Sequence, residues 1–143
     1  MTTHVAAILR TKGHKVVTVP PEVTVGALIK TLAEHRIGAV PVVEHGEHLV
    51  GIVSERDVVR ALADGATALD RSVRSVMTAN VQTCSLEDSV FDLMNLMTRG
   101  RFRHLPVVER GLLVGIISIG DVVKERLGEA EYELDNLKSY IAS

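Results

Sequence analysis

The segment LVGIVSERDVV, residues 49–59, is repeated further along the chain as LVGIISIGDVV, residues 113–123. The repeat extends upstream, where VVEHG at residues 42–46 recurs as VVERG at residues 107–111. The two copies are offset by 65 residues before the shared glycine turn and by 64 residues after it, so the second turn is one residue shorter. Turns tolerate such changes in length better than strands do. Two copies of about 60 residues predict a duplicated unit rather than a solenoid, which needs more repeats.

Each copy has the sequence pattern of a β-α-β-β-α unit. A short β-branched run comes first, at residues 16–19 and 81–84. A one-sided amphipathic helix follows Thr24 and Ser89, because apolar residues recur there at i, i+3, i+4 and i+7. Two β-branched runs around a glycine turn predict a hairpin, and a second helix is expected to begin near Ser54 and Ser118. The fold class predicted is therefore α/β, with two repeats related by pseudo-twofold symmetry and sharing one core.

The predicted domain limits are residues 5–65 for repeat 1, 73–128 for repeat 2 and 129–143 for a C-terminal helical tail. Residues 65–74 form the connector, and residues 5–9 are expected to be helical. In the last segment Leu127, Leu134, Leu137 and Ile141 lie near heptad spacing. This pattern leaves two alternatives open, a helix that packs on its own domain and a helix that contacts a second copy, because a few turns alone are marginal.

Composition excludes several classes of function. The chain has 143 residues, of which 46% are hydrophobic and 24% charged, so it is globular rather than disordered. A net charge of −2, with 3% aromatic residues and no tryptophan, argues against a generic nucleic-acid binder and against stacking platforms. There is no apolar run long enough to span a membrane and no signal-peptide pattern. The single cysteine, Cys84, allows no internal disulfide, and a cytoplasmic location is expected.

The ordered set of motifs, occurring twice, resembles a tandem cystathionine-β-synthase (CBS) domain pair, or Bateman module, of the stand-alone type found in bacteria. The first copy carries IGAVPVV at residues 37–43 and GIVSERD at residues 51–57. The second carries FRHLPVV at residues 102–108 and GIISIGD at residues 115–121. The resemblance covers residues 5–127. It implies two clefts that bind adenosine-containing ligands, AMP or ATP or NAD(H), without a metal ion, and it implies a homodimer.

In this family each cleft mixes elements of both copies, which assigns the candidate residues. The first cleft would use Thr18, Val19, Ile37, Gly38, Ala39 and Val40 with Ser118 and Asp121. The second would use Thr83, Cys84, Phe102, Arg103, His104 and Leu105 with Ser54, Arg56 and Asp57. The function implied is a regulatory sensor of adenine nucleotides that acts on an unknown downstream protein, and not an enzyme.

The residue types suit this chemistry. A carboxylate such as Asp57 or Asp121 can accept two hydrogen bonds from a ribose diol. The serine three residues earlier lies at a helix start, where free N–H groups can meet a phosphate. Ser-x-x-Asp is equally a capping box that only stabilises the helix. Arg103 and His104 favour a phosphorylated ligand in the second cleft, whereas Gly38 and Ala39 leave room for a bulkier one, such as a dinucleotide.

Other motifs have simpler readings. His45, Glu47 and His48 share one turn, but a hairpin tip rarely converges its side chains on a metal ion, so we expect a solvated turn. Cys84 is expected to be a buried structural thiol. The basic run at residues 99–103 could contact nucleic acid, which gives one rival function, a nucleic-acid-binding regulator. The other rival is a protein-interaction scaffold with empty clefts. There is no catalytic constellation of nucleophile and base.

Overall fold

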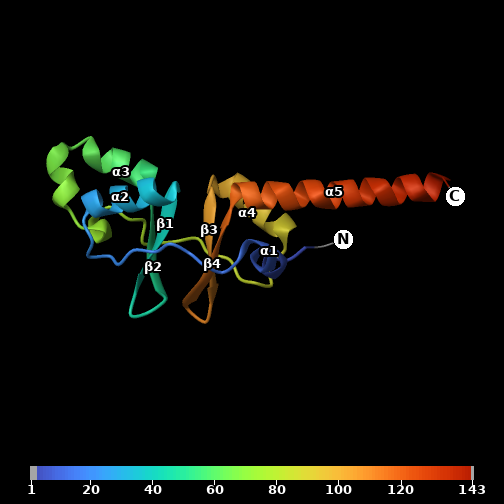
Figure 1. Cartoon of the computed structure of the whole chain (residues 1–143), viewed down its shortest axis with the longest axis horizontal. Coiled ribbons are helices and arrows are strands. Elements are labelled where there is room, and N and C mark those ends of the chain that lie inside the picture. The colour runs from blue at the N-terminus through green and yellow to red at the C-terminus, as the bar shows by residue number, and fades with distance from the viewer. Residues whose placement is uncertain (1–2, 143) are drawn as a thin grey trace. The chain divides into compact units, whose positions relative to one another are not determined.

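The computed structural model describes residues 3–142 of the chain (Figure 1). Contacts divide these residues into two compact units. We call the first the β1–β2 unit; it consists of Lys15–Gln82 together with Arg110–Val114. We call the second the β3–β4 unit; it consists of the chain up to His14, of Thr83–Glu109, and of the chain from Gly115 onward.

The β1–β2 unit is built from a helix, a hairpin and a second helix. Its elements are α2 (Val25–His35), β1 (Ala39–Glu44), β2 (His48–Ser54), α3 (Glu55–Leu62) and the 3-10 helices η1 (Ala66–Asp70) and η2 (Val73–Ser75). Thr24 caps α2, because its side chain accepts the Ala27 N–H at 3.1 Å. The apolar faces of these elements form one core, which contains Val19, Val25, Leu28, Leu32, Val40, Val42, Val53, Val58 and Val73.

The β3–β4 unit repeats the helix, hairpin and helix, adds one helix at the N-terminal side and has a much longer second helix. Its elements are α1 (Val5–Lys12), α4 (Val90–Gly100), β3 (His104–Glu109), β4 (Leu112–Ser118, of which residues 112–114 belong to the β1–β2 unit) and α5 (Ile119–Ala142). α1 is fixed by backbone bonds, since Val5 N–H donates to Asp88 O at 2.9 Å and Ala6 N–H donates to Leu86 O at 3.0 Å. The buried residues of this unit include Val5, Ile8, Leu9, Val90, Leu93, Met97, Leu105, Val107, Ile117 and Val122.

Both predicted hairpins are present, and their turns explain the one-residue offset. In the second, Arg110 and Gly111 have φ of 54° and 80°, as a two-residue type I′ turn requires. In the first, His45 and Gly46 also have positive φ, but Glu47 makes the loop longer. Separately from the turn, the pairing of β1 with β2 shifts register between Val42 and Val43, where Val50 is the extra residue of the ladder.

Within the β1–β2 unit, the first residues of β4 lie next to β2, in the order β1-β2-β4. β2 and β4 pair antiparallel only at His48 and Leu112, and both residues belong to the β1–β2 unit. The mixed α/β class with antiparallel hairpins confirms the predicted fold class. Pseudo-twofold symmetry and a shared core remain predictions.

The short strands predicted at residues 16–19 and 81–84 are not strands in the structure. Each is reduced to one parallel bridge, Val19 with Val42 and Cys84 with Val107. Val19 makes both bonds to β1, and the next residue that would donate to β1 is Pro21, which has no N–H, so the first ladder ends there. After Cys84 the next N–H that would face β3 is that of Leu86, and it donates to the Glu109 carboxylate at 2.9 Å, so the second ladder does not continue.

The C-terminal segment is a helix, but not a separate one. α5 runs without interruption over 24 residues from Ile119 to Ala142, so the expected second helix of repeat 2 and the expected tail are one element. Figure 1 shows the end of α5 extending well beyond the rest of the β3–β4 unit. From Glu131 to Ala142 every residue is exposed.

Candidate ligand-binding sites

The two Ser-x-x-Asp turns have the same geometry and are capping boxes. Ser54 N–H donates to Asp57 Oδ2 at 2.9 Å, and Asp57 N–H donates back to Ser54 Oγ at 3.4 Å. Ser118 N–H donates to Asp121 Oδ2 at 2.9 Å, and Asp121 N–H donates to Ser118 Oγ at 3.1 Å. Each aspartate therefore helps to fix a helix start. The bonds described here end on Oδ2, and a carboxylate can accept further donors.

Each turn lies beside the segment that precedes the first hairpin strand of the same copy. Glu55 N–H donates to Gly38 O at 2.9 Å, and Ala39 pairs with Ser54. In the other unit, Ile119 N–H donates to Arg103 O at 2.8 Å. The structure thus brings together residues that the predicted clefts assign to different sites. The predicted combinations of one copy's segment with the other copy's turn remain predictions, as does the assignment of Arg56, which is exposed on α3.

Asp121 has a cationic neighbour that sequence reasoning missed. Lys12, the last residue of α1, donates from Nζ to Asp121 Oδ2 at 2.6 Å and to Ile116 O at 2.9 Å. Burial alone would raise the pKa of Asp121, but the hydrogen bonds from Lys12 and Ser118 outweigh it and lower that pKa below its ordinary value. Asp121 is therefore ionised at neutral pH. No local pattern pairs Lys12 with Asp121, because 109 residues separate them.

His104 lies close to the same charges and is half-buried at the start of β3. Burial lowers its pKa below the ordinary value, and the positive charges of Lys12 and Arg103 lower it further, against an opposing effect of Asp121. His104 is therefore neutral at pH 7. Together Lys12, Arg103, His104, Ser118 and Asp121 form a group within the β3–β4 unit that we call the Asp121 cluster.

The other residues predicted to line the clefts differ in how far they are buried. Val40 and Leu105 are fully buried, so only their backbone could reach a ligand. Phe102 lies against the end of α4: a Cβ on Gly100 would come within 2.1 Å of its ring. Cys84 is buried, as expected, and burial, together with the nearby Asp88 charge, raises its pKa to about 12. Thr18 and Thr83 are half-buried next to the parallel bridges.

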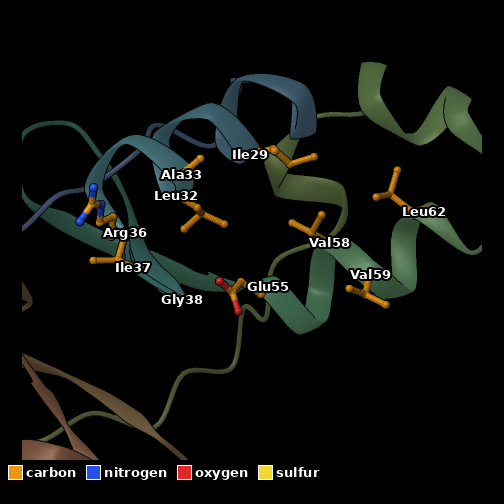
Figure 2. A pocket seen from close by; sticks show the side chains of 10 residues that line it. All are labelled: Ile29, Leu32, Ala33, Arg36, Ile37, Gly38, Glu55, Val58, Val59 and Leu62. Carbon is orange, nitrogen blue, oxygen red and sulfur yellow. The ribbon is translucent and has the colours of Figure 1, made fainter.

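A hollow of about 640 Å³ lies between α2 and α3 in the β1–β2 unit (Figure 2). Ile37 and Gly38, both candidates for the first cleft, line it. Figure 2 shows Arg36 and Glu55 toward the Gly38 end, while apolar side chains cover the rest. These apolar residues are Ile29, Leu32, Ala33, Val58, Val59 and Leu62. Glu55 lies directly beside Gly38, since a Cβ added there would be 3.7 Å from its carboxyl carbon.

Two of the minor motifs can be placed. Within residues 3–142, no group of three or more His, Cys, Asp or Glu side chains is arranged to hold a metal ion. The basic run at residues 99–103 contains the end of α4 and its left-handed cap, Arg101, with φ of 58°. No helix in the part of the chain that the structure describes is both long and apolar enough to cross a membrane.

The family model described as "CBS domain" matches the chain twice, over residues 5–64 and 73–128. The crystal structure of the CBS-domain containing protein ATU1752 from Agrobacterium tumefaciens is 50% identical, with a TM-score of 0.82, and the match covers 87% of this chain and 99% of that one. The mitochondrial CBS domain-containing protein CBSX3 of Arabidopsis thaliana is 37% identical over 123 residues. That match covers 82% of this chain and 60% of the length of CBSX3.

Two related structures contain adenosine compounds. The CBS domain pair of protein MJ0100 is in complex with 5′-methylthioadenosine and S-adenosyl-L-methionine; it is 26% identical, with a TM-score of 0.79, and the match covers 90% of this chain and 99% of that one. CBSX2 is in complex with AMP; it is 26% identical, with a TM-score of 0.77, and the match covers 89% of this chain and 98% of that one. Since the family model matches well over half of the residues, in two copies, this chain belongs to the CBS-domain family as a pair of CBS domains.

Proposed function

We propose that this chain is a regulatory module that binds an adenosine-containing ligand, AMP, ADP, ATP or NAD(H), and signals its occupancy to a partner protein. The observation that carries the proposal is the Asp121 cluster, where an ionised carboxylate at a helix start lies beside the Lys12 ammonium. Family membership, and the adenosine compounds bound by MJ0100 and CBSX2, support the class of ligand.

The cluster offers distinct groups for the parts of a nucleotide. Asp121 accepts the ribose hydroxyls, in charge-assisted bonds worth about 1.5–3 kcal/mol each. Arg103 and Lys12 supply the positive charge for a phosphate. His104, being neutral, contributes a single hydrogen bond rather than a charge. The Lys12 ammonium uses two of its three N–H groups on Ile116 and Asp121, and its side chain is 36% exposed, so the third can meet a phosphate.

Signalling would follow from a shift in population. A ligand that binds one conformation of the pair better than another favours that conformation by the difference in its affinities. A partner protein that recognises the favoured conformation then responds to the ligand. A catalytic step is not needed for this function.

Thermal unfolding with AMP, ADP, ATP, NAD(H), S-adenosylmethionine and a short RNA tests the proposal. A ligand at about 100 times its dissociation constant adds about 2.7 kcal/mol to stability. Asp121→Asn should abolish the shift from a ligand held by the Asp121 cluster, and Asp57→Asn, which changes the matching capping box, is the paired variant. The double variant Arg103→Ala, His104→Ala should weaken the binding of phosphorylated ligands more than it weakens the binding of S-adenosylmethionine.

The other outcomes separate the rival functions. A chain that no adenosine compound stabilises is a scaffold, and the proposal is then wrong. Stabilisation by RNA alone, falling steeply with salt, identifies a nucleic-acid-binding regulator. If a ligand raises the stability of the wild type and of both aspartate variants equally, neither carboxylate belongs to the binding site.

A further inference from the structure

The exposed end of α5 carries a complete heptad seam. Its apolar residues alternate in steps of three and four, which places Leu127, Leu134 and Ile141 at a positions and Ala130 and Leu137 at d positions. Leu127, Leu134, Leu137 and Ile141 are 60%, 50%, 54% and 73% exposed. A helix that packs on its own domain buries such a stripe, and this one does not.

The opposite side of α5 is the side that attaches to its own unit. Val122 and Glu129, seven residues apart at c positions, are its buried residues. Glu129 accepts the Thr3 N–H at 3.2 Å and pairs with Arg126, whose guanidinium lies 5.2 Å from the centre of the Phe91 ring. The seam therefore points away from the surface that already holds the helix.

The charged residues on either side of the apolar seam indicate that a second copy of the chain packs against it. Glu131 and Lys138 are at e positions, and Glu133 is at a g position. In a parallel, in-register pair of helices, a g residue faces the e residue of the next heptad on the other helix. Glu133 of each copy then faces Lys138 of the other, which gives two attractive pairs by symmetry.

An antiparallel pair fits less well. In the register that sets Leu127 against Leu137 of the second copy, Glu131 and Glu133 each face their own equivalents, which repel. The register shifted by one heptad removes this repulsion but leaves Leu127 without an apolar partner.

We propose that residues 127–141 pair with the same segment of a second copy in a parallel, in-register, two-stranded coiled coil. Two heptads alone would be too short to form a stable helix in water. Here the helix is already formed, because its first turns are fixed in the β3–β4 unit, so association does not have to nucleate it. The inference does not depend on the ligand proposed above.

Site-specific disulfide formation in the full chain tests the pairing. Leu134→Cys places a thiol at an a position, where the parallel pair brings it next to its equivalent, and Asp135→Cys is the matched control at the outward b position. Cys84 is buried, so the wild type serves as the second control. Under mild oxidation Leu134→Cys should form linked dimers at least about tenfold faster than either control. Equal rates for the two variants, or no linkage by Leu134→Cys, would overturn the proposal.

Charge reversal tests the orientation. Glu133→Lys and Lys138→Glu, each in the Leu134→Cys background, should slow linkage separately, because both create two repulsive pairs. An equimolar mixture of the two variants should restore it, since every g–e contact between the unlike chains is then attractive. A mixture that links no faster than the separate variants would rule out the parallel arrangement.

Discussion

Gly115 of β4 leaves room for Leu9 of α1, and replacing it should loosen α1 from the β3–β4 unit. A Cβ at Gly115 would be 2.7 Å and 2.9 Å from the two terminal methyl carbons of Leu9, where ordinary contact begins at 3.4 Å. Leu9 is 0% exposed, so its methyl groups cannot move aside into solvent. Gly115→Ala therefore forces the helix or the strand to shift.

The expected cost follows from two opposing effects. Overpacking a buried contact costs about 1–3 kcal/mol. Removing the glycine restricts the unfolded chain and returns about 0.4–1 kcal/mol. We expect a net loss of about 1–2 kcal/mol, and a fall in Tm of about 3–8 °C, measured by urea and thermal denaturation. The control is Gly128→Ala on α5, where an added Cβ meets nothing within 4 Å and helix propensity should add up to about 1 kcal/mol.

A double-mutant cycle assigns the cause. Leu9→Ala alone opens a cavity and should cost about 2–5 kcal/mol. In that background the methyl group that Gly115→Ala introduces has space, so this second substitution should cost at least about 1 kcal/mol less than it does in the wild type. If Gly115→Ala costs the same in both backgrounds, the contact with Leu9 is not the reason for the glycine.

Three further outcomes can be measured on the same material. Lys12→Met removes the partner that lowers the pKa of Asp121, so the wild type should be more stable than this variant by about 0.2–1 kcal/mol at pH 7. This advantage should shrink as the pH falls below the ordinary aspartate pKa of 3.8, because the carboxylate of Asp121 is then protonated. A difference that persists at pH 2 would contradict this. Cys84, with its pKa raised to about 12, should react with a thiol reagent at pH 8 only in denaturant; rapid reaction of the native chain would show that the thiol is accessible. Ser89→Ala removes the bond from Asp92 N–H to Ser89 Oγ, 3.1 Å long, that caps α4, and should cost about 1 kcal/mol; an unchanged denaturation midpoint would mean that the cap contributes nothing.

Local features of the sequence were enough to predict the hairpins and most of the helices. The β-branched runs around Gly46 and Gly111 predict strands with a tight turn, and the structure places positive φ at both glycines. Ser54 and Ser118 predict helix starts, and α3 and α5 begin at the next residue. These signals are local, because each depends on residues a few positions apart.

The contacts of the Asp121 cluster could not be predicted from local sequence patterns. Lys12 reaches Ile116 across 104 residues, and no periodicity or motif encodes that approach. The strand predicted at residues 16–19 was wrong for a different reason: its composition is typical of a strand, but Pro21 has no N–H for the next bond, so the ladder ends after one bridge. The resemblance to CBS pairs supplied the candidate residues, and it gave no indication of Lys12.

The place of α1 in the fold has a consequence for synthesis of the chain. α1 is translated well before Leu86, Asp88 and Gly115, which hold it in the folded unit. At about 5–20 residues per second, α1 waits roughly 5–20 s before β4 is translated. During that interval the nearly continuous β1–β2 unit can fold, while Val5, Ile8 and Leu9 stay exposed. A nascent chain in which residues 15–82 have left the ribosome, stalled before β4 emerges, should therefore be protected over that segment and protease-sensitive at α1.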